Sequence, residues 1–322
     1  MTMMSDVLKV LDSAPRIVVG SHVKPDGDSV GSSLGLGRWL RGRGAEVSVV
    51  VPGSVPPQFA FLPDCELVRA EFPEDPCQCT VVIVDTPSPG RTGAPDGYLD
   101  GAATVVNIDH HPDNEMFGDL NVVDPGASSV ALILHEMILE SGYEPDRETA
   151  TDLYVGVLTD TGGFRFGNTD ARTLKAAASL VERGADAPRI ATKVYGEQSP
   201  ARLRLLGLVL ASLETVLEGR AAVMVLTARM REESGALDDE IEGLASYGHL
   251  VRDAEVAALL REENGRVRVS LRSSGRSDVN RVARELGGGG HKAAAGAVLT
   301  ASLQEARSRV LEAISRVLEG DR

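Results

Sequence analysis

Acidic residues and histidines occur at four places in the first half of the sequence, and each place follows an apolar run or a predicted helix. These residues are His22, Asp26, Asp28, Asp85, Asp109, His110, His111 and Asp160. Carboxylates gathered at one place repel one another unless a cation lies among them. Imidazole and carboxylate ligands without thiolate suit manganese, iron or magnesium better than a structural zinc. The sequence therefore predicts a site for divalent metal ions.

The same pattern indicates a kind of reaction. Two metal ions ~3.5–4 Å apart are the usual arrangement for hydrolysing phosphate esters. A carboxylate must bridge such a pair, and Asp85, at the end of an apolar run, is well placed to do so. A single Asp at such a position is usually a helix cap or turn former, and a lone His is usually a surface or core residue. All four segments together, each after a strand or helix, favour a shared catalytic role.

The elements that must position these residues can be predicted from periodicity. Short apolar runs predict strands at 16–20, 47–51, 80–85 and 103–109. Amphipathic patterns predict helices at 30–44, 128–142, 146–162 and 170–184. Continuous apolar strands separated by helices predict a parallel sheet covered on both faces. Because parallel sheets place their sites at the C-terminal ends of the strands, we expect the four segments to meet at one edge.

A change in pattern near residue 185 predicts two domains. Residues 185–200 contain two prolines and no sustained periodicity, so we place a linker there, between domains at 1–184 and 201–322. In the second domain we expect helices at 201–217 and 278–286 and strands at 221–227, 254–260 and 266–272. The expected fold class is α/β: a parallel-sheet domain, a smaller C-terminal αβ domain and an active-site cleft between them.

The charge distribution limits the partners. The formal net charge is −14 at pH 7. Long DNA or RNA is bound by neutralising many phosphates with Lys and Arg, so this charge disfavours such a partner. Between Arg266 and Lys292, however, basic residues outnumber acidic ones. This local patch suits a small anionic ligand, although an ordinary solvated helix face is the alternative.

Other features indicate where the protein acts. No stretch approaches the ~20 apolar residues of a membrane helix, and the first residues lack the pattern of a secretory signal. The three cysteines, Cys65, Cys77 and Cys79, form no CxxC pair and are typical of a reducing compartment. We therefore expect a cytoplasmic protein that does not bind membranes.

Six segments resemble the DHH phosphoesterase family. In the first half they are HVKPDGDSVGS (22–32), VVIVDTPSPGR (81–91), NIDHHPDN (107–114), DPGASSVALILHEM (124–137) and LTDTGGFRF (158–166). The sixth, SLRSSGRSDVNRVARELGGGGHKAAAG (270–296), is similar to the C-terminal domain of that family. Within the family, the chain resembles the bacterial oligoribonucleases that also act as phosphatases of 3′-phosphoadenosine 5′-phosphate. Relatives of these cleave cyclic or linear adenine dinucleotides.

The resemblance implies a role for each residue of the site. The implied metal ligands are His22, Asp26 and Asp85 for one ion, and Asp28, Asp85, His110 and Asp160 for the other. His111 would face the substrate phosphate, and Asp109 would orient the ligands. The implied cofactors are two divalent ions, Mn²⁺ as the first choice and Mg²⁺ or Co²⁺ as alternatives.

The resemblance assigns substrate binding to the second domain. The implied residues are Arg272, Gly288, Gly289, Gly290 and His291. Glycines let the backbone approach a ligand closely and direct N–H groups at an anion. Without the resemblance, four glycines would more simply be a flexible turn. In the first domain, Phe164 and Phe166 could stack a base, but two aromatics near a sheet are more often core.

Four functions are considered for a chain with these residues. The main prediction is hydrolysis of short oligoribonucleotides, adenine dinucleotides such as pApA and cyclic di-AMP, and phosphoadenosine phosphate. The alternatives are an inorganic pyrophosphatase or exopolyphosphatase, a processive single-strand exonuclease, and a non-catalytic nucleotide sensor. The run GGGGHKAAAG favours the nucleotide enzyme over the pyrophosphatase. The preferred substrate, the direction of cleavage and the oligomeric state, a homodimer included, stay open.

Overall fold

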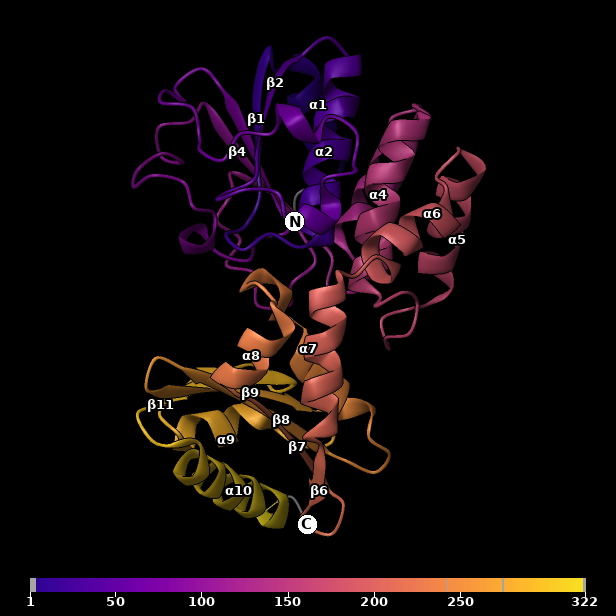
Figure 1. Ribbon diagram of the computed structural model, residues 1–322. Coiled ribbons are helices and arrows are strands. Elements are labelled where there is room, and N and C mark those ends of the chain that lie inside the picture. The colour runs from indigo at the N-terminus through magenta and orange to yellow at the C-terminus, as the bar shows by residue number, and fades with distance from the viewer. Residues whose placement is uncertain (1–3, 242, 274, 321–322) are drawn as a thin grey trace. The chain divides into compact units, whose positions relative to one another are not determined.

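The computed structural model describes residues 4–320 apart from 242 and 274, and the chain forms two compact units, Met1–Glu197 and Gln198–Arg322 (Figure 1). The segment 185–200, where the sequence predicts a linker, is largely helical. Helix α6 (Ala187–Ala191) and a π-helical turn (Thr192–Gly196) belong to the first unit. Among the described residues no helix is long and apolar enough to cross a membrane.

The first unit is built on a five-stranded sheet in the order β2-β1-β3-β4-β5. Its strands are β1 (Arg16–Gly20), β2 (Glu46–Val50), β3 (Thr80–Val84), β4 (Thr104–Asp109) and β5 (Leu120–Val123). All four pairings are parallel, which confirms the predicted sheet. Strand β5, with the sequence LNVV, was not predicted, because four residues are too short a run to show a periodicity.

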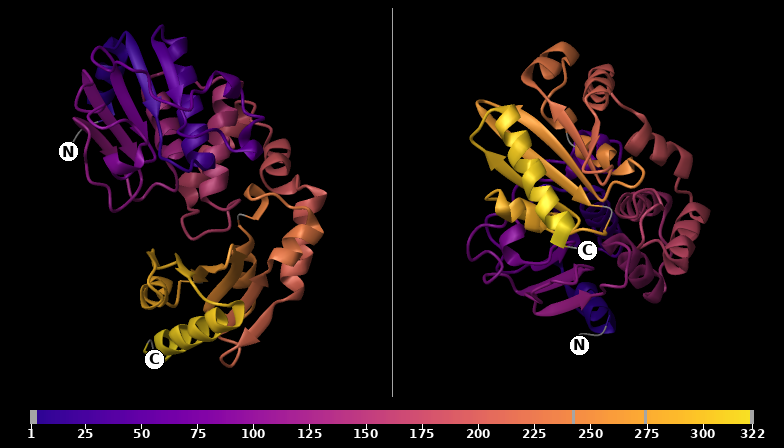
Figure 2. Two further views of the ribbon diagram at one scale, coloured as in Figure 1. Left: turned by 60° about the vertical axis from the view of Figure 1, so that its left-hand side comes forward. Right: turned by 90° about the horizontal axis from the view of Figure 1, so that it is seen from below.

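The helices of this unit are gathered on one face of the sheet (Figure 2). They are α1 (Met4–Ser13), α2 (Gly27–Gly42), α3 (Val130–Glu140), α4 (Arg147–Asp160) and α5 (Ala171–Glu182). On the helical face, Val19 and Val82 join a core shared with these helices. On the other face, Val81 and Ile83 pack against Phe72 and Tyr98, which come from loops. The expected cover on both faces is therefore present, but one side of it is loop.

Helix α2 begins at Gly27, three residues before the predicted start. Asp26 caps it by accepting hydrogen bonds from the backbone N–H groups of Asp28 (3.1 Å) and Ser29 (3.0 Å). The earlier start places Asp28 in the first helical turn. Helix α4 approaches α2 very closely there, since a Cβ on Gly156 would lie 2.5 Å from Oδ1 of Asp28. Two acidic segments of the sequence are thereby brought together.

The second unit contains a six-stranded sheet in the order β10-β11-β9-β8-β7-β6. Its strands are β6 (Glu214–Val216), β7 (Ala221–Leu226), β8 (Val256–Glu263), β9 (Arg266–Ser273), β10 (Gly289–Gly290) and β11 (Ala294–Leu299). Only β7 and β8 are parallel among these pairings of described residues. Helices α9 (Val279–Glu285) and α10 (Leu303–Gly320) pack on one face, whereas α7 (Pro200–Ala211) and the 3₁₀ turn Leu244–Leu250 pack on the other.

One prediction for this unit was wrong in detail. The helix expected at 201–217 ends at Ala211, and a short strand, β6, follows it. The strand expected at 266–272 is confirmed as β9, and Arg266 and Arg268 lie on its exposed face, where burial alternates. Helix α8 (Ala228–Ser234), strand β11 and helix α10 were not predicted.

Candidate functional site

Asp85 lies where strand β3 ends, in the left-handed backbone region with φ of +53°. Its N–H donates to the carbonyl of Ile108 on the neighbouring strand at 3.0 Å. Oδ2 of Asp85 lies 3.4 Å from Nε2 of His22, and Oδ1 lies 3.6 Å from Nε2 of His110. The two oxygens of one buried carboxylate thus face two different histidines.

The structure brings the six predicted metal ligands together. One group is His22, Asp26 and Asp85, and another is Asp28, His110 and Asp160. Nε2 of His110 lies 3.2 Å from Oδ2 of Asp160, and Nε2 of His22 lies 3.9 Å from Oδ1 of Asp26. In each group the ligand atoms lie within 4.8 Å of one another. Within a third group, Asp85 and His110 are joined by His111.

Backbone carbonyls orient the two histidines that face Asp85. Nδ1 of His22 lies 2.9 Å from the carbonyl oxygen of Val23, and Nδ1 of His110 lies 3.2 Å from that of Ala127. A carbonyl can only accept, so Nδ1 must carry the proton in both rings. Nε2 is then the ring atom directed at the carboxylates, and it is the atom that a neutral imidazole would offer to a metal ion.

Asp28 is held by the start of helix α3. Its Oδ2 accepts a hydrogen bond from the N–H of Val130 at 2.6 Å, and its Oδ1 accepts from Ala131 at 3.0 Å and from the Ser32 hydroxyl at 3.0 Å. These donors fix the position of the carboxylate. Ser129 caps this helix, since its hydroxyl accepts a hydrogen bond from Leu132 N–H at 3.1 Å.

The electrostatics of the site fit divalent cations. Burial, together with neighbouring carboxylates, raises the pKa of Asp85 and that of Asp160 well above the usual range. The pKa of Asp28 is also raised, chiefly by burial. Within the described part of the chain, every ion pair of Asp26, Asp85 and Asp160 is with a histidine. The carboxylates are crowded and have little positive charge near them. A divalent ion bound by these oxygen and imidazole groups would neutralise their negative charge.

The carboxylate of Asp109 contacts the ring of His111, which is not among the six predicted metal ligands. It is fully buried, its Oδ1 lies 2.8 Å from Nδ1 of His111, and its Oδ2 accepts from the Asn114 amide at 2.6 Å. Burial opposes ionisation, but these hydrogen bonds outweigh it and lower the pKa of Asp109. The Asn114 amide is held in turn by Asn107 Oδ1 at 2.8 Å. Sequence reasoning missed both asparagines, although Asn107 and Asn114 begin and end the segment NIDHHPDN.

The predicted substrate residues of the second unit meet at one end of its sheet. Arg272 on β9 pairs with Ala294 on β11, and His291 exchanges two backbone hydrogen bonds with Ala294, at 2.8 and 3.2 Å. Arg272 is half-buried, which lowers its pKa, whereas His291 is exposed.

Gly288 and Gly290 also have a packing role. A Cβ on Gly288 would lie 2.1 Å from the carbonyl oxygen of Gly296, and one on Gly290 would lie 2.5 Å from Cα of Ala295. Gly289 pairs with Gly296. The close approach of the glycine run to strand β11 therefore requires glycine at 288 and 290, whether or not a ligand is bound.

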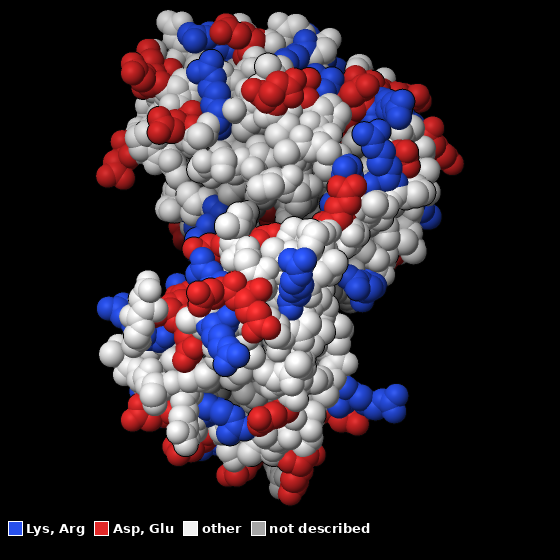
Figure 3. All heavy atoms as spheres, viewed as in Figure 1, with Lys and Arg blue, Asp and Glu red and all other residues white. Residues whose placement is uncertain are grey.

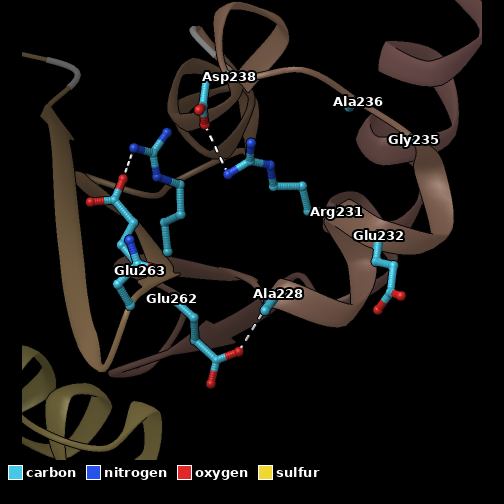
Figure 4. Close-up of a pocket in the computed structure, with 10 residues that line it drawn as sticks. Ala228, Arg231, Glu232, Gly235, Ala236, Asp238, Glu262 and Glu263 are labelled. Carbon is cyan, nitrogen blue, oxygen red and sulfur yellow. Dashed lines mark hydrogen bonds and ion pairs between the residues drawn. The ribbon is translucent and has the colours of Figure 1, made fainter.

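A cavity of about 600 Å³ lies elsewhere in the second unit, between α8 and the β8–β9 hairpin (Figure 4). Its two arginines are already engaged, Arg231 with Asp238 at 2.9 Å and Arg261 with Glu263. None of the predicted site residues lines it. On the face of the molecule shown in Figure 3, basic and acidic side chains are interspersed.

The two phenylalanines after Asp160 behave differently. Phe164 packs against the core of the first unit, with its ring 6.2 Å from that of Tyr154, as the core interpretation predicts. Phe166 is 53% exposed, and its ring covers Gly162. The core interpretation was wrong for Phe166.

Comparison with known proteins gives consistent matches. Residues 16–157 match the N-terminal domain of the DHH family, and residues 220–320 match the DHHA1 domain. The chain is 37% identical to the bifunctional oligoribonuclease and PAP phosphatase NrnA of Thermus thermophilus, over 99% of this chain and 94% of that protein. It is 29% identical to the cyclic-di-AMP phosphodiesterase PdeA of Listeria monocytogenes, over 97% of this chain and 49% of the other. The crystal structure of an exopolyphosphatase-related protein from Bacteroides fragilis superimposes with a TM-score of 0.87 at 28% identity, covering 97% of this chain and 95% of that one.

Proposed function

The chain belongs to the DHH family, and on that premise we propose that it is a two-metal phosphoesterase that hydrolyses short nucleotides. The substrates we propose are short oligoribonucleotides, linear or cyclic adenine dinucleotides and 3′-phosphoadenosine 5′-phosphate. The activities named for the Thermus and Listeria relatives support this range.

We assign the metal ligands as two sets that share one carboxylate. His22, Asp26 and Asp85 would hold one ion, and Asp28, Asp85, His110 and Asp160 would hold the other. The observation that carries this assignment is the placement of the two Asp85 oxygens, one toward His22 at 3.4 Å and one toward His110 at 3.6 Å. Manganese is the first choice, with magnesium or cobalt as alternatives, because the donors are oxygen and imidazole without thiolate.

When bound, the ions would supply Lewis-acid polarisation of the phosphoryl oxygens and a hydroxide nucleophile at neutral pH. The side chains supply the rest. His22 and His110 direct their Nε2 atoms at the site because backbone carbonyls accept hydrogen bonds from their Nδ1 atoms. His111 is held by Asp109 at 2.8 Å, which leaves its Nε2 for an oxygen of the substrate phosphate. From that position His111 would donate a hydrogen bond to a phosphate oxygen that gains negative charge.

We assign the second unit the task of choosing the substrate. Arg272 carries the planar fork of donors that suits a phosphate, and exposed His291 lies on the adjoining turn. Their position next to the glycine run supports a nucleotide enzyme over an inorganic pyrophosphatase, as does the name of the Thermus relative. We expect the activity in a reducing compartment, the cytoplasm, because Cys65, Cys77 and Cys79 are free thiols.

The proposal can be tested with one grid of assays. Metal-free protein is incubated with pApA, cyclic di-AMP, 3′-phosphoadenosine 5′-phosphate, pyrophosphate and a long single-stranded RNA. Mn²⁺, Mg²⁺ or Co²⁺ is restored one at a time. We expect turnover of the small nucleotides, highest with Mn²⁺, and little with the other two substrates. Turnover of pyrophosphate alone would establish the main alternative, and binding of nucleotides without turnover would establish a sensor.

A further inference from the structure

Arg172, in the first turn of α5, binds two carboxylates at once. Its Nε and Nη2 donate to the two carboxylate oxygens of Glu136 at 2.6 and 2.5 Å, and its Nη1 donates to Oδ2 of Asp124 at 2.7 Å. Asp124 lies directly after strand β5, and Glu136 lies on helix α3. One guanidinium therefore holds both flanks of the segment 124–136.

That segment contacts two of the proposed metal ligands through its backbone. The carbonyl of Ala127 faces Nδ1 of His110 at 3.2 Å. The N–H groups of Val130 and Ala131 donate to the carboxylate of Asp28 at 2.6 and 3.0 Å. A shift of this backbone would change the tautomer or rotation of His110 and would loosen Asp28.

Asp124 connects Arg172 to the turn that carries these contacts. Its Oδ1 accepts from Gly126 N–H at 2.9 Å, and its carbonyl accepts from Ala127 N–H at 3.0 Å. Its own N–H donates to the carbonyl of Asp109 at 3.0 Å. Rotation of the Asp124 carboxylate would therefore disturb the turn whose Ala127 carbonyl orients His110.

The chain between Asp160 and Arg172 is fastened to the same segment. The side-chain amide of Asn168 donates to the carbonyl oxygens of Ser128 and Asp160, both at 3.1 Å. Asp160 is the last residue of α4 and faces His110. Asn168 thus links a third proposed ligand to the segment that Arg172 holds.

From these contacts we infer that Arg172 is a positioning residue for the metal centre, which it stabilises through Asp124 and the 124–131 backbone. The inference rests on the proposed function, because it assumes that His110, Asp28 and Asp160 bind metal. The side chains of Arg172, Asp124 and Glu136 are 36–38% exposed, so the two ion pairs among them contribute little to global stability. Their effect should appear in metal affinity.

The test compares Mn²⁺ binding by calorimetry in wild type, Arg172→Met and Arg183→Met. Arg183 is the control, because it caps the other end of α5 and pairs with Glu144 at 3.6 Å, whereas Arg172 holds Asp124 and Glu136. We expect Arg172→Met to weaken Mn²⁺ binding about tenfold or more, in the range typical of residues that orient metal ligands. Arg183→Met should bind Mn²⁺ like wild type. The melting temperature of the metal-free protein should change little in either variant.

Two further variants separate positioning from general damage. Asp124→Asn keeps an oxygen for Gly126 N–H but removes the charge that Arg172 binds, so it should weaken Mn²⁺ binding as well. Both substitutions remove the same ion pair, Arg172–Asp124. The double variant should therefore bind Mn²⁺ no more weakly than the weaker of the two single variants. Arg172→Lys should recover only part of the affinity, because a single ammonium cannot reproduce the fork.

The outcomes distinguish this inference from the proposed function. Wild-type protein that binds no Mn²⁺ would overturn the proposed function, and the inference with it. Wild-type binding that is unchanged in both Arg172→Met and Asp124→Asn would overturn the inference alone. Equal losses in Arg172→Met and Arg183→Met would do the same, because they would indicate an unspecific effect on helix α5.

Discussion

Nδ1 of His111 lies 2.8 Å from Oδ1 of Asp109, whereas the same atom of the preceding residue, His110, faces a backbone carbonyl. The pKa of Asp109 is lowered in spite of burial, so its carboxylate is ionised and can only accept. At Nδ1, His111 thus has a charged partner and His110 a neutral one. We therefore expect two different tasks for these adjacent histidines, with His110 as a metal ligand and His111 as a hydrogen-bond donor to the substrate phosphate.

This difference predicts separate phenotypes. His110→Ala should lose metal on dialysis, because its Nε2 lies among the proposed ligands at 3.2 Å from Asp160 and 3.6 Å from Asp85. His111→Ala should keep its metal but lose ~10²–10⁴-fold in turnover, the usual contribution of proton donation in a transition state. Elemental analysis and steady-state rates check this. Equal metal loss in both variants would contradict the division of roles.

A second prediction concerns Asp85. Asp85→Asn should lower turnover on every substrate by ~100-fold or more, because it removes the charge shared by the two proposed ions. An asparagine tolerates the positive φ of this position, so the fold should survive. Wild-type turnover in the variant would show that Asp85 is not the carboxylate shared by the two ions.

The same substitution should stabilise the metal-free protein. The pKa of Asp85 is raised by burial in the folded state. Between its unfolded value of ~3.9 and the higher folded value, the folded state binds more protons, so stability falls as pH rises. Asp85→Asn avoids this loss. Its melting temperature in chelator should exceed that of wild type at pH 8, and the gap should narrow toward pH 4. The exposed Asp96→Asn serves as control, and a gap that is independent of pH would contradict the assignment.

The edge of the sheet that carries the proposed metal ligands could be predicted because its signals are local. Apolar runs identified β1, β3 and β4, and each ended beside an acidic or imidazole side chain. The contacts between distant segments could not be predicted in this way. That the amides of Val130 and Ala131 hold Asp28 depends on the packing of α3 against α2, which sequence spacing does not encode.

The role of the glycine run could not be predicted from the sequence for a different reason. Sequence reasoning attributed Gly288 and Gly290 to close approach by a ligand, whereas a Cβ at either position would collide with strand β11. Both explanations invoke the same lack of a side chain. Because β11 is rich in alanine and was not predicted as a strand, the sequence offered no partner for the packing explanation.

A third prediction concerns pH. The pKa values of Asp85, Asp160 and Asp28 are raised in the metal-free protein. These carboxyls hold protons at pH values where an ordinary Asp is ionised, and a metal ion must displace them. Mn²⁺ binding should therefore release protons, seen as a heat that depends on the buffer, and should weaken as pH falls from 8 to 6. Activity should collapse below about pH 6, near the reference histidine pKa, and excess metal should partly restore it. Activity insensitive to pH and chelator would contradict a metal mechanism.

The last prediction concerns the second unit. If Arg272 and His291 bind the nucleotide, they should govern substrate choice and leave the metal centre unchanged. A charge-assisted hydrogen bond contributes ~1.5–3 kcal/mol, about a tenfold to hundredfold effect. Arg272→Ala or His291→Ala should therefore lower kcat/KM for pApA by that factor, while both variants retain metal and hydrolyse bis-p-nitrophenyl phosphate almost normally. Arg268→Ala is the matched control, because Arg268 lies on the exposed face of the same strand and pairs with Glu263 at 3.2 Å. It should leave both activities unchanged. The contrary result is that the Arg272 and His291 variants keep the wild-type ratio of pApA to artificial-ester activity. That result would mean that neither residue recognises the nucleotide, and that the glycine run serves only the packing of β10 on β11.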